Sequence, residues 1–434
     1  MPLPRSSAPT TTTSAPGSPH RVTTPQPQAR NTAKLHTSAP ITPHKGDTVT
    51  DLSDLINIDS QLTADELELR QTVREFVDRR FRPNIAEWYE KAVFPTEIIP
   101  EMAELGLLGM HIKGNGCAGR SAVEYGIAMQ ELEAGDSGLR TFISVQGSLA
   151  MSAINKHGSD EQKAKYLPEM AAGRMIGCFG LTEPNAGSDP SGMETVATRE
   201  GDEWVLNGKK RWIGLGTIAD LAIIWARTDE GVRGFIVPTK SQGFSAVALE
   251  PKLSMRASIQ TEITLDNVRL SEEQRLPGAT SLRAPFECLN EARYGIVWGA
   301  MGAARDAFEV AARYTGERKQ FDRPISSFQL TQEKLVNMAL EIQKGQLLAL
   351  HLGRLKDAGK LEHHMISVGK LNNCREAIKI CRDARAMLGG NGILLEYSPL
   401  RHANNLESVR TYEGTDEVHT LILGQKLTGI PAFR

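Results

Sequence analysis

The chain has 434 residues, more than one small hydrophobic core can organise, so two or three domains are expected. Its 50 Lys plus Arg residues nearly balance 52 Asp plus Glu residues, which gives no electrostatic reason to expect nucleic acid or an anionic membrane as a partner. The five cysteines are scattered and odd in number, which disfavours a disulfide framework and fits a reducing compartment. No apolar run has the length of a membrane span, so membrane insertion is not expected.

Residues 1–47 differ in composition from the rest of the chain. They hold nine of the 22 prolines among many Thr, Ser and Gln residues, and the first acidic residue is Asp47. Such a segment has too little apolar surface to offset the entropy of ordering, so we expect a disordered extension. A cytoplasmic location is favoured. The alternative is a transit peptide, and hence the mitochondrial matrix, because the segment carries arginines and almost no acids.

Residues 48–174 predict an N-terminal helical domain. Thr63 followed by Glu66 is a capping box, and Leu69, Val73 and Phe76 then recur at the spacing of a helix core stripe. Gly135-Asp136-Ser137-Gly138 is expected to interrupt the helices that follow.

Residues 175–285 change to short β-favouring runs separated by turn residues, which predicts a middle antiparallel β domain. Asn207-Gly208 lies between two such runs and predicts a hairpin turn. No GxGxxG sequence follows a strand, so a Rossmann nucleotide site is not expected.

Residues 286–434 return to long helical segments with short connections, which predicts a C-terminal helical bundle. The order along the chain is helices, then strands, then helices. The expected fold class is therefore α+β.

Several short stretches carry groups suited to chemistry. Glu413 stands alone between Tyr412 and Gly414 on a small turn, which suits a base aimed at a substrate carbon, although a solvated surface glutamate is the simpler interpretation. The loop Phe179–Pro190 is rich in Gly and hydroxyls that could hold a phosphate or a polar cofactor, or could only lead into a strand.

Arginines add two further candidates. Arg318 near Gln329 could bind a diphosphate or lie on a solvated face. Arg140 beyond Glu133 could form a structural ion pair or bind a substrate carboxylate. The adjacent His363 and His364 point about 100° apart on a helix and lack an HExxH or CxxC motif, so no metal site is predicted.

Five ordered motifs resemble the acyl-CoA dehydrogenase family over roughly Leu52 to the C-terminus. They are FGLTEPNAGSDP (Phe179–Pro190), RWIG (Arg211–Gly214), ERKQF (Glu317–Phe321) with Gln329, MLGGNG (Met387–Gly392) and TYEGTDEVH (Thr411–His419). Four further stretches are most similar to members that oxidise glutaryl-CoA, namely Ile112–Gly119, Glu131–Arg140, Cys288–Gly295 and Gly353–Asp357.

The resemblance implies a helical domain, a middle β domain and a C-terminal four-helix bundle. It implies FAD as the cofactor, a homotetramer, an electron-transfer flavoprotein as the electron acceptor, and a place in lysine and tryptophan degradation.

It also implies roles for individual residues. Glu413 corresponds to the catalytic base that removes the proton α to the thioester carbonyl. The implied acyl-CoA contacts are Arg140, Thr141, Glu133, Ser188, Phe286, Leu289, Asn290, Arg293, Tyr412 and Gly414. The implied FAD contacts, some made across a subunit boundary, are Phe179, Leu181, Thr182, Ser188, Trp212, Ile213, Gly214, Arg318, Gln329, Met387, Leu388, Gly389, Gly390, Thr415 and Glu417.

The glutaryl-CoA likeness rests mainly on Arg140. A buried substrate carboxylate needs a partner, and Arg140 matches the family residue with that role, with Glu133 and Tyr412 near the same end of the acyl chain. Oxidation in such members is followed by loss of carbon dioxide, which gives crotonyl-CoA. Thr141 stands where those members usually carry Ser. Gly214 replaces the family's usual Thr, which removes a hydroxyl near the flavin and opens the question of reactivity with oxygen.

Two rival functions remain open at the level of sequence. One is a short-chain acyl-CoA dehydrogenase or oxidase acting on an uncharged chain, in which Arg140 is structural. The other is a non-catalytic scaffold that binds CoA or flavin, which the presence of Glu413 disfavours.

Overall fold

The computed structural model describes residues 52–433, and the expected disordered extension at residues 1–47 lies outside them. Helical segments come first: η1 (Leu52–Leu55), η2 (Ile58–Gln61), α1 (Ala64–Arg80), α2 (Ile85–Lys91), η3 (Thr96–Ile98), α3 (Ile99–Glu104), α4 (Ala122–Gly135), α5 (Ser137–Ile143), the π-helical segment η4 (Ser144–Met151), α6 (Ser152–His157) and α7 (Asp160–Ala171). A two-stranded ribbon, β1 (Lys113–Gly114) with β2 (Cys117–Ala118), precedes α4.

A seven-stranded sheet follows, built from β3 (Gly177–Gly180), β4 (Val196–Glu200), β5 (Glu203–Gly214), β6 (Leu221–Thr228), β7 (Gly231–Pro238), β8 (Phe244–Ala248) and β9 (Gln260–Ser271), with the short turns η5 (Pro190–Gly192) and η6 (Glu272–Gln274). The path runs β3-β6-β4-β5-β9-β8, and β7 also pairs with β6. Most pairs are antiparallel, as expected, but β6 pairs in parallel with both β3 and β4.

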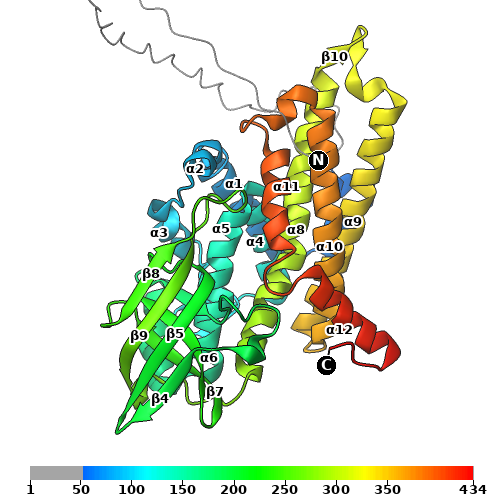
Figure 1. Cartoon of the computed structure of the whole chain (residues 1–434). Coiled ribbons are helices and arrows are strands. Elements are labelled where there is room, and N and C mark those ends of the chain that lie inside the picture. The colour runs from blue at the N-terminus through cyan, green and yellow to red at the C-terminus, as the bar shows by residue number, and fades with distance from the viewer. Residues whose placement is uncertain (1–51, 434) are drawn as a thin grey trace, which may run out of the picture. The chain divides into compact units, whose positions relative to one another are not determined.

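The C-terminal part contains α8 (Arg283–Glu317), α9 (Gln329–Asp357), α10 (His363–Met387), α11 (Ser398–Val409) and α12 (Asp416–Thr428). Short elements join them: the ribbon β10 (Lys319–Gln320) with β11 (Arg323–Pro324), then η7 (Ile325–Ser327), and η8 (Gly389–Ile393). Figure 1 shows the sheet in green at the lower left and these helices on the right, with α4 and α5 between them and with α2 and α3 above the sheet. The predicted α, β, α order is therefore confirmed.

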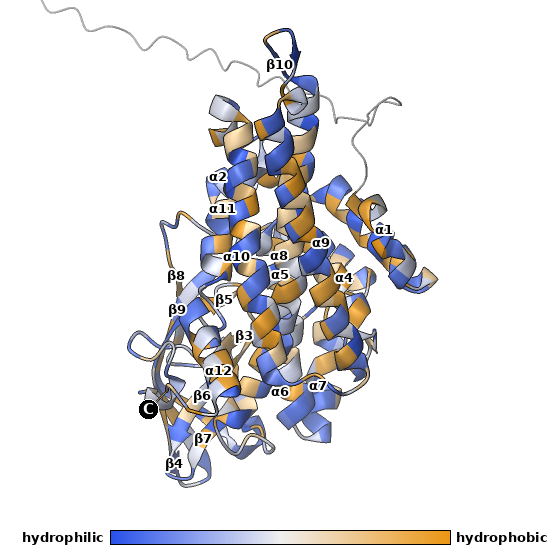
Figure 2. Ribbon diagram, turned by 90° about the vertical axis from the view of Figure 1, so that its right-hand side faces the viewer, coloured by the Kyte–Doolittle hydropathy of each residue, from blue (hydrophilic) through white to orange (hydrophobic). Residues whose placement is uncertain are grey.

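Local signals explain where several helices begin. Thr63 and Glu66 form the predicted capping box at the start of α1. Asp136 separates helix α4 from helix α5, as expected from the Gly135–Gly138 sequence. Its side chain caps α5 by accepting a hydrogen bond from Gly138 N at 2.7 Å. Figure 2 shows polar and apolar residues mixed along most helices, as core-facing stripes require.

The hairpin predicted at Asn207-Gly208 is wrong. Both residues lie inside the single strand β5, which pairs with β9 from Glu203 to Gly214. Gly208, with φ of 148°, sits at a bulge where a Cβ would come within 2.5 Å of Thr195 Oγ1. Pairing with β4 and β9 on either side therefore overrides the local turn signal.

Helices α4 and α8 approach each other very closely. A Cβ on Gly302 would lie 1.9 Å from the Gln130 carbonyl oxygen, and one on Gly299 would lie 2.0 Å from a carboxylate oxygen of Glu133. Gly302 therefore lets the two helix backbones approach, and Gly299 leaves the space in which the Glu133 carboxylate lies.

The loop after β3 is fixed to the sheet by a buried ion pair. Lys210 Nζ lies 2.7 Å from Glu183 Oε1 with both side chains almost fully buried, and it also donates to the Leu181 carbonyl at 3.2 Å. Thr195 N donates to the same Glu183 oxygen at 3.0 Å. This network fixes the first part of the Phe179–Pro190 loop, at Leu181 and Glu183, to strand β5.

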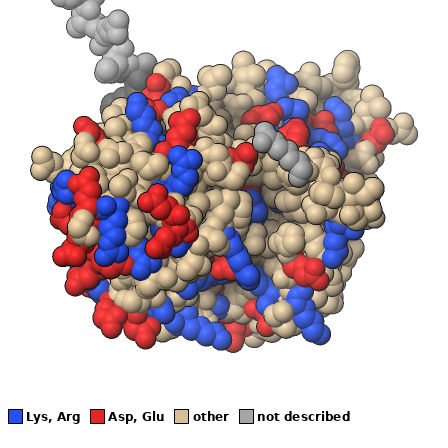
Figure 3. Space-filling view, turned by 60° about the horizontal axis from the view of Figure 1, so that its bottom comes forward, with Lys and Arg blue, Asp and Glu red and all other residues tan. Residues whose placement is uncertain are grey.

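Charges on the molecular surface are mixed in sign. Figure 3 shows Lys and Arg side chains interspersed with Asp and Glu on one face. In the part of the chain that the structure describes, no helix is both long and apolar enough to cross a bilayer.

We expect Lys210→Met to lower the free energy of unfolding by about 3 kcal/mol, because it leaves the Glu183 carboxylate buried without its cation. Lys209→Met is the matched control, since Lys209 is exposed and lies 3.8 Å from Glu262; its effect should stay below about 0.5 kcal/mol. Urea unfolding of both variants checks this, and equal midpoints would contradict it.

Candidate active site

Glu413 lies on the turn between α11 and α12. It has φ of 56°, and Gly414 after it has φ of 100°, so two consecutive residues are left-handed. Thr415 caps α12 by accepting a hydrogen bond from Val418 N at 3.3 Å. Left-handed backbone is costly for a glutamate, which indicates that surrounding structure holds the turn.

The Glu413 carboxylate points inward. Its Oε2 atom is buried and has no hydrogen-bond partner among residues 52–433. Burial raises the pKa of Glu413, while Arg140, Lys370 and Arg293 act in the opposite direction. The interpretation as a solvated surface glutamate therefore fails, and the group is a desolvated carboxylate suited to act as a base.

Arg140 and Glu133 form the charged end of the same site. Arg140 Nε lies 2.8 Å from Glu133 Oε2, and both side chains are 0% exposed. Tyr412 accepts a hydrogen bond from Arg140 Nη2, and its hydroxyl lies 3.3 Å from Thr141 Oγ1. Arg140 is thus tied to the residue that precedes Glu413.

One nitrogen of Arg140 remains free for a ligand. Nη1 is buried and has no partner in the described chain. The hydroxyl of Ser144, one helical turn further along at the start of η4, is also buried and unpartnered among the described residues. Two orphaned polar groups on one segment indicate that something polar binds beside them.

Ser144 lies outside the motifs of the sequence. Its spacing of four from Arg140 places the two side chains on one face only if the helix continues through both residues. The structure supplies that continuity, because α5 passes directly into η4.

Helix α8 contributes further residues around Glu413. Arg293 Nε donates to the Glu413 carbonyl oxygen at 2.7 Å, and Nη1 lies 3.4 Å from Asn290 Oδ1. Arg293 therefore supports the turn that carries Glu413. Phe286 and Leu289 lie half-buried on the same helix.

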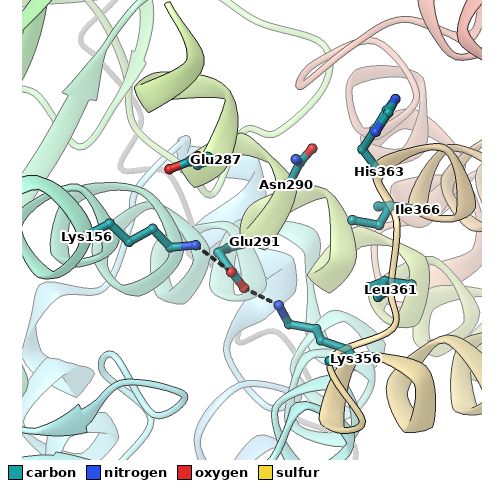
Figure 4. Close-up of a pocket in the computed structure, with 9 residues that line it drawn as sticks. Lys156, Glu287, Asn290, Glu291, Lys356, Leu361, His363 and Ile366 are labelled. Atoms are coloured by element: carbon teal, nitrogen blue, oxygen red, sulfur yellow. Dashed lines mark hydrogen bonds and ion pairs between the residues drawn. The ribbon is translucent and has the colours of Figure 1, made fainter. Parts of the chain in front are cut away.

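A polar hollow of about 260 Å³ opens beside Asn290. In Figure 4 the Glu291 carboxylate lies between Lys156 and Lys356, at 2.8 Å and 2.7 Å. The remaining lining residues are Glu287, Gly359, Leu361, His363 and Ile366. Arg293 contacts both Asn290 of this hollow and the Glu413 carbonyl, so its side chain lies between the hollow and the base-bearing turn.

The sheet presents the predicted flavin residues. Phe179, Leu181 and Ile213 are buried, whereas Trp212 is 57% exposed at a φ of 62°. A Cβ on Gly214 would lie 3.1 Å from Val145 Cγ2, and Val145 belongs to η4, which continues the helix of Arg140. The contact between Gly214 and Val145 therefore places the end of β5 against η4, the helical segment that continues from Arg140.

The exposed indole of Trp212 offers a flat aromatic surface that fits a largely aromatic cofactor such as a flavin. Thr182 is half-buried in the adjoining loop, and Ser188 is exposed further along it. Thr415 begins α12, and Glu417 is exposed on the first turn of that helix.

The other predicted cofactor residues lie far from Glu413 within one chain. Arg318 directly follows the end of α8, and the helix from Arg293 to its last residue, Glu317, rises about 36 Å. Arg318 and Gln329 are exposed, and so are Gly389 and Gly390, while Met387 is half-buried and Leu388 is buried. Tyr314 in the last turn of α8 accepts a hydrogen bond from Asn391, which places the Met387–Gly390 turn at this remote end as well.

Three domain models of one family match successive parts of the chain. They describe the acyl-CoA dehydrogenase N-terminal domain over residues 63–174, the middle domain over 178–268 and the C-terminal domain over 282–428. The chain belongs to the acyl-CoA dehydrogenase family.

Individual relatives agree on the family and differ in their named specificity. A glutaryl-CoA dehydrogenase structure from Mycobacterium smegmatis is 62% identical with a TM-score of 0.88, and covers 89% of this chain and 100% of its own. A second, described as a Mycobacterium smegmatis glutaryl-CoA dehydrogenase in complex with FADH2, is 57% identical with a TM-score of 0.88 and the same coverage.

A short-chain specific acyl-CoA dehydrogenase of Clostridium acetobutylicum is 35% identical, covering 85% of this chain and 100% of that protein. Membership of this acyl-CoA dehydrogenase family implies FAD as the cofactor, in agreement with the fit of the Trp212 region.

A base must be ionised to remove a proton, so activity falls as pH decreases through the pKa of Glu413. Because burial raises that pKa, we expect the acid limb of the kcat/KM profile for an acyl-CoA to lie above pH 4.5, the ordinary value for a glutamate. Glu413→Gln should lower kcat by at least about 1000-fold and keep bound FAD.

Glu407→Gln is the control, because Glu407 is an exposed acid of α11 that pairs with Arg382. An acid limb at the position of a solvated glutamate, or equal activity of the two variants, would contradict the assignment of the base.

Proposed function

We propose that this chain catalyses the FAD-dependent α,β-dehydrogenation of glutaryl-CoA, followed by decarboxylation to crotonyl-CoA. The observation that carries the proposal is the buried, unpartnered Nη1 of Arg140. Leaving such a donor unsatisfied costs about 1–3 kcal/mol, and the terminal carboxylate of a glutaryl chain would satisfy it.

The charge of the site supports the same substrate. Arg140, Arg293 and Lys370 act on Glu413 as cations, and the two carboxylates of Glu413 and Glu133 do not balance them. Burial lowers the pKa of His419 to about 3, so this neighbour adds no charge at neutral pH. One additional carboxylate, brought by the substrate, would complete the balance.

Each residue of the site has a separate role in this reaction. Glu413 takes the proton from the carbon α to the thioester, and backbone N–H groups of its turn are suited to stabilise the enolate oxygen. Arg140, with Thr141 and Ser144 beside it, holds the far carboxylate and thereby fixes the α and β carbons relative to Glu413. When bound, FAD supplies the two-electron acceptor for the hydride from the β carbon.

Decarboxylation follows from the product of that step. The new double bond places the terminal carboxylate where the electron pair of its carbon–carbon bond can delocalise into the thioester. Carbon dioxide leaves, a proton is added at the γ carbon, and crotonyl-CoA results. The polar hollow beside Asn290 is suited to the amide-containing arm of CoA.

Assembly and electron transfer complete the proposal. Leu330, Val336, Leu340 and Leu347 are exposed apolar side chains of α9, and Arg318 with Gln329 lies remote from Glu413 in its own chain. Both features support a homotetramer in which a second subunit supplies part of the FAD site. An electron-transfer flavoprotein as acceptor and a cytoplasmic location, with the mitochondrial matrix as alternative, remain predictions of the sequence.

A short-chain acyl-CoA dehydrogenase or oxidase is the second candidate, supported by the short-chain relative at 35% identity. In it the Arg140–Glu133 pair would only stabilise the fold. Gly214 favours the oxidase form, because a hydroxyl usual in the family is missing beside the flavin position. Substrate preference and peroxide formation distinguish these alternatives.

Arg140→Met combined with Glu133→Gln removes both charges and leaves no buried ion unpaired. We expect kcat/KM for glutaryl-CoA to fall by about 100-fold or more, because a desolvated charge-assisted contact is lost, and that for butyryl-CoA to change less than about threefold. Parallel kinetics with both substrates, and carbon dioxide release from glutaryl-CoA, check this. Arg174→Ala, at an exposed arginine, is the control; equal losses on both substrates would reject the carboxylate-binding role.

A further inference from the structure

Lys370 of α10 is a buried cation placed directly behind the base-bearing turn. Its side chain is 1% exposed. Its Nζ donates to the Tyr412 carbonyl at 2.7 Å and to the Gly414 carbonyl at 2.5 Å. No motif in the sequence singles out this lysine.

The carbonyl between these two is held as well, since Arg293 Nε donates to the Glu413 oxygen at 2.7 Å. Three consecutive carbonyls therefore accept hydrogen bonds from cationic side chains of two helices, α8 and α10. Charge-assisted bonds of this kind are about twice as strong as neutral ones, enough to offset the cost of the left-handed backbone at Glu413.

Peptide geometry connects this contact to catalysis. The Tyr412 carbonyl and the Glu413 N–H belong to one planar trans peptide, so they point in opposite directions. A cation fixed on the oxygen side orients the N–H toward the opposite side and polarises it into a stronger donor.

We propose that Lys370 is a positioning residue that aims and strengthens the Glu413 N–H as a hydrogen-bond donor to the substrate thioester oxygen. This rests on the proposed function, in which the Glu413 side chain deprotonates an acyl-CoA. The same contact keeps the carboxylate and the oxyanion donor of one residue in fixed relative positions.

The surroundings of Lys370 leave it few other roles. Glu413, Arg293, Asp416 and Cys374 are the ionisable groups that act on it, and Asp416 is paired with Arg375 at 3.1 Å. Burial lowers the pKa of Lys370 to about 8, so the side chain is still cationic at pH 7. Its described hydrogen bonds all go to the turn of Glu413.

Two variants separate the hydrogen bonds from the charge. Lys370→Met removes both, whereas Lys370→Gln keeps amide donors without a charge. Lys379→Met is the matched control, since Lys379 lies on the same helix, is exposed, and pairs with Glu376 at 2.7 Å. All are studied as the full-length FAD-containing enzyme.

The first readout is exchange of the substrate α hydrogens with D2O, followed with glutaryl-CoA and the flavin kept chemically reduced so that oxidation cannot proceed. The second is the thioester carbonyl stretch of bound crotonyl-CoA in difference infrared spectra. A merely structural lysine would leave that stretch unchanged.

We expect Lys370→Met to slow exchange by about 100-fold and to move the carbonyl stretch toward its value in free crotonyl-CoA. Lys370→Gln should fall between Lys370→Met and the wild type on both readouts. Exchange within twofold of Lys379→Met, with an unchanged stretch, would overturn the proposal. If Lys370→Met does not fold, Lys370→Gln decides, and wild-type values for it would overturn the proposal equally.

Failure of the proposed function is recognised separately. If the wild type exchanges butyryl-CoA but not glutaryl-CoA, the glutaryl assignment fails, and the variants are compared on butyryl-CoA. If the wild type exchanges neither while Glu413→Gln behaves identically, the base assignment fails, and the proposal for Lys370 fails with it.

Discussion

The turn Tyr412–Gly414 is held by hydrogen bonds from two helices, α8 and α10, to its three carbonyl groups. Left-handed backbone at a glutamate is unfavourable by itself, and the bonds from Lys370 and Arg293 offset that cost. The direction of the Glu413 carboxylate depends on this contact. The packing of α8, α10 and the α11–α12 connection is therefore a condition for the chemistry as well as for stability.

Electrostatics at Glu413 is a balance between two opposed effects. Burial raises its pKa and makes it a stronger base, while the three neighbouring cations Arg140, Lys370 and Arg293 act in the opposite direction. Arg140 takes part in this balance and also carries an unsatisfied donor.

The segment from α4 to η4 connects the parts of the site. It carries Glu133, Arg140 and Ser144, and its residue Val145 lies against the end of β5 at Gly214. A π-helical stretch changes the register of side chains along a helix, and such stretches are frequent at functional sites. Here the continuous helix formed by α5 and η4 carries Arg140 toward the base-bearing turn and Val145 toward the sheet.

The sequence by itself determined the order of helical and β regions, the capping box at Thr63, the break at Gly135–Gly138 and the candidate base, because these depend on residues close together in the chain. Its motifs also pointed to Arg140. Only the tertiary structure decided that Asn207-Gly208 lies within a strand, that Arg293 supports the Glu413 carbonyl, and that Ser144 and Lys370 belong to the site. Those outcomes depend on strand pairing and on contacts between helices far apart in sequence. A local sequence pattern does not show which distant residues will pair or come into contact, so it cannot predict them.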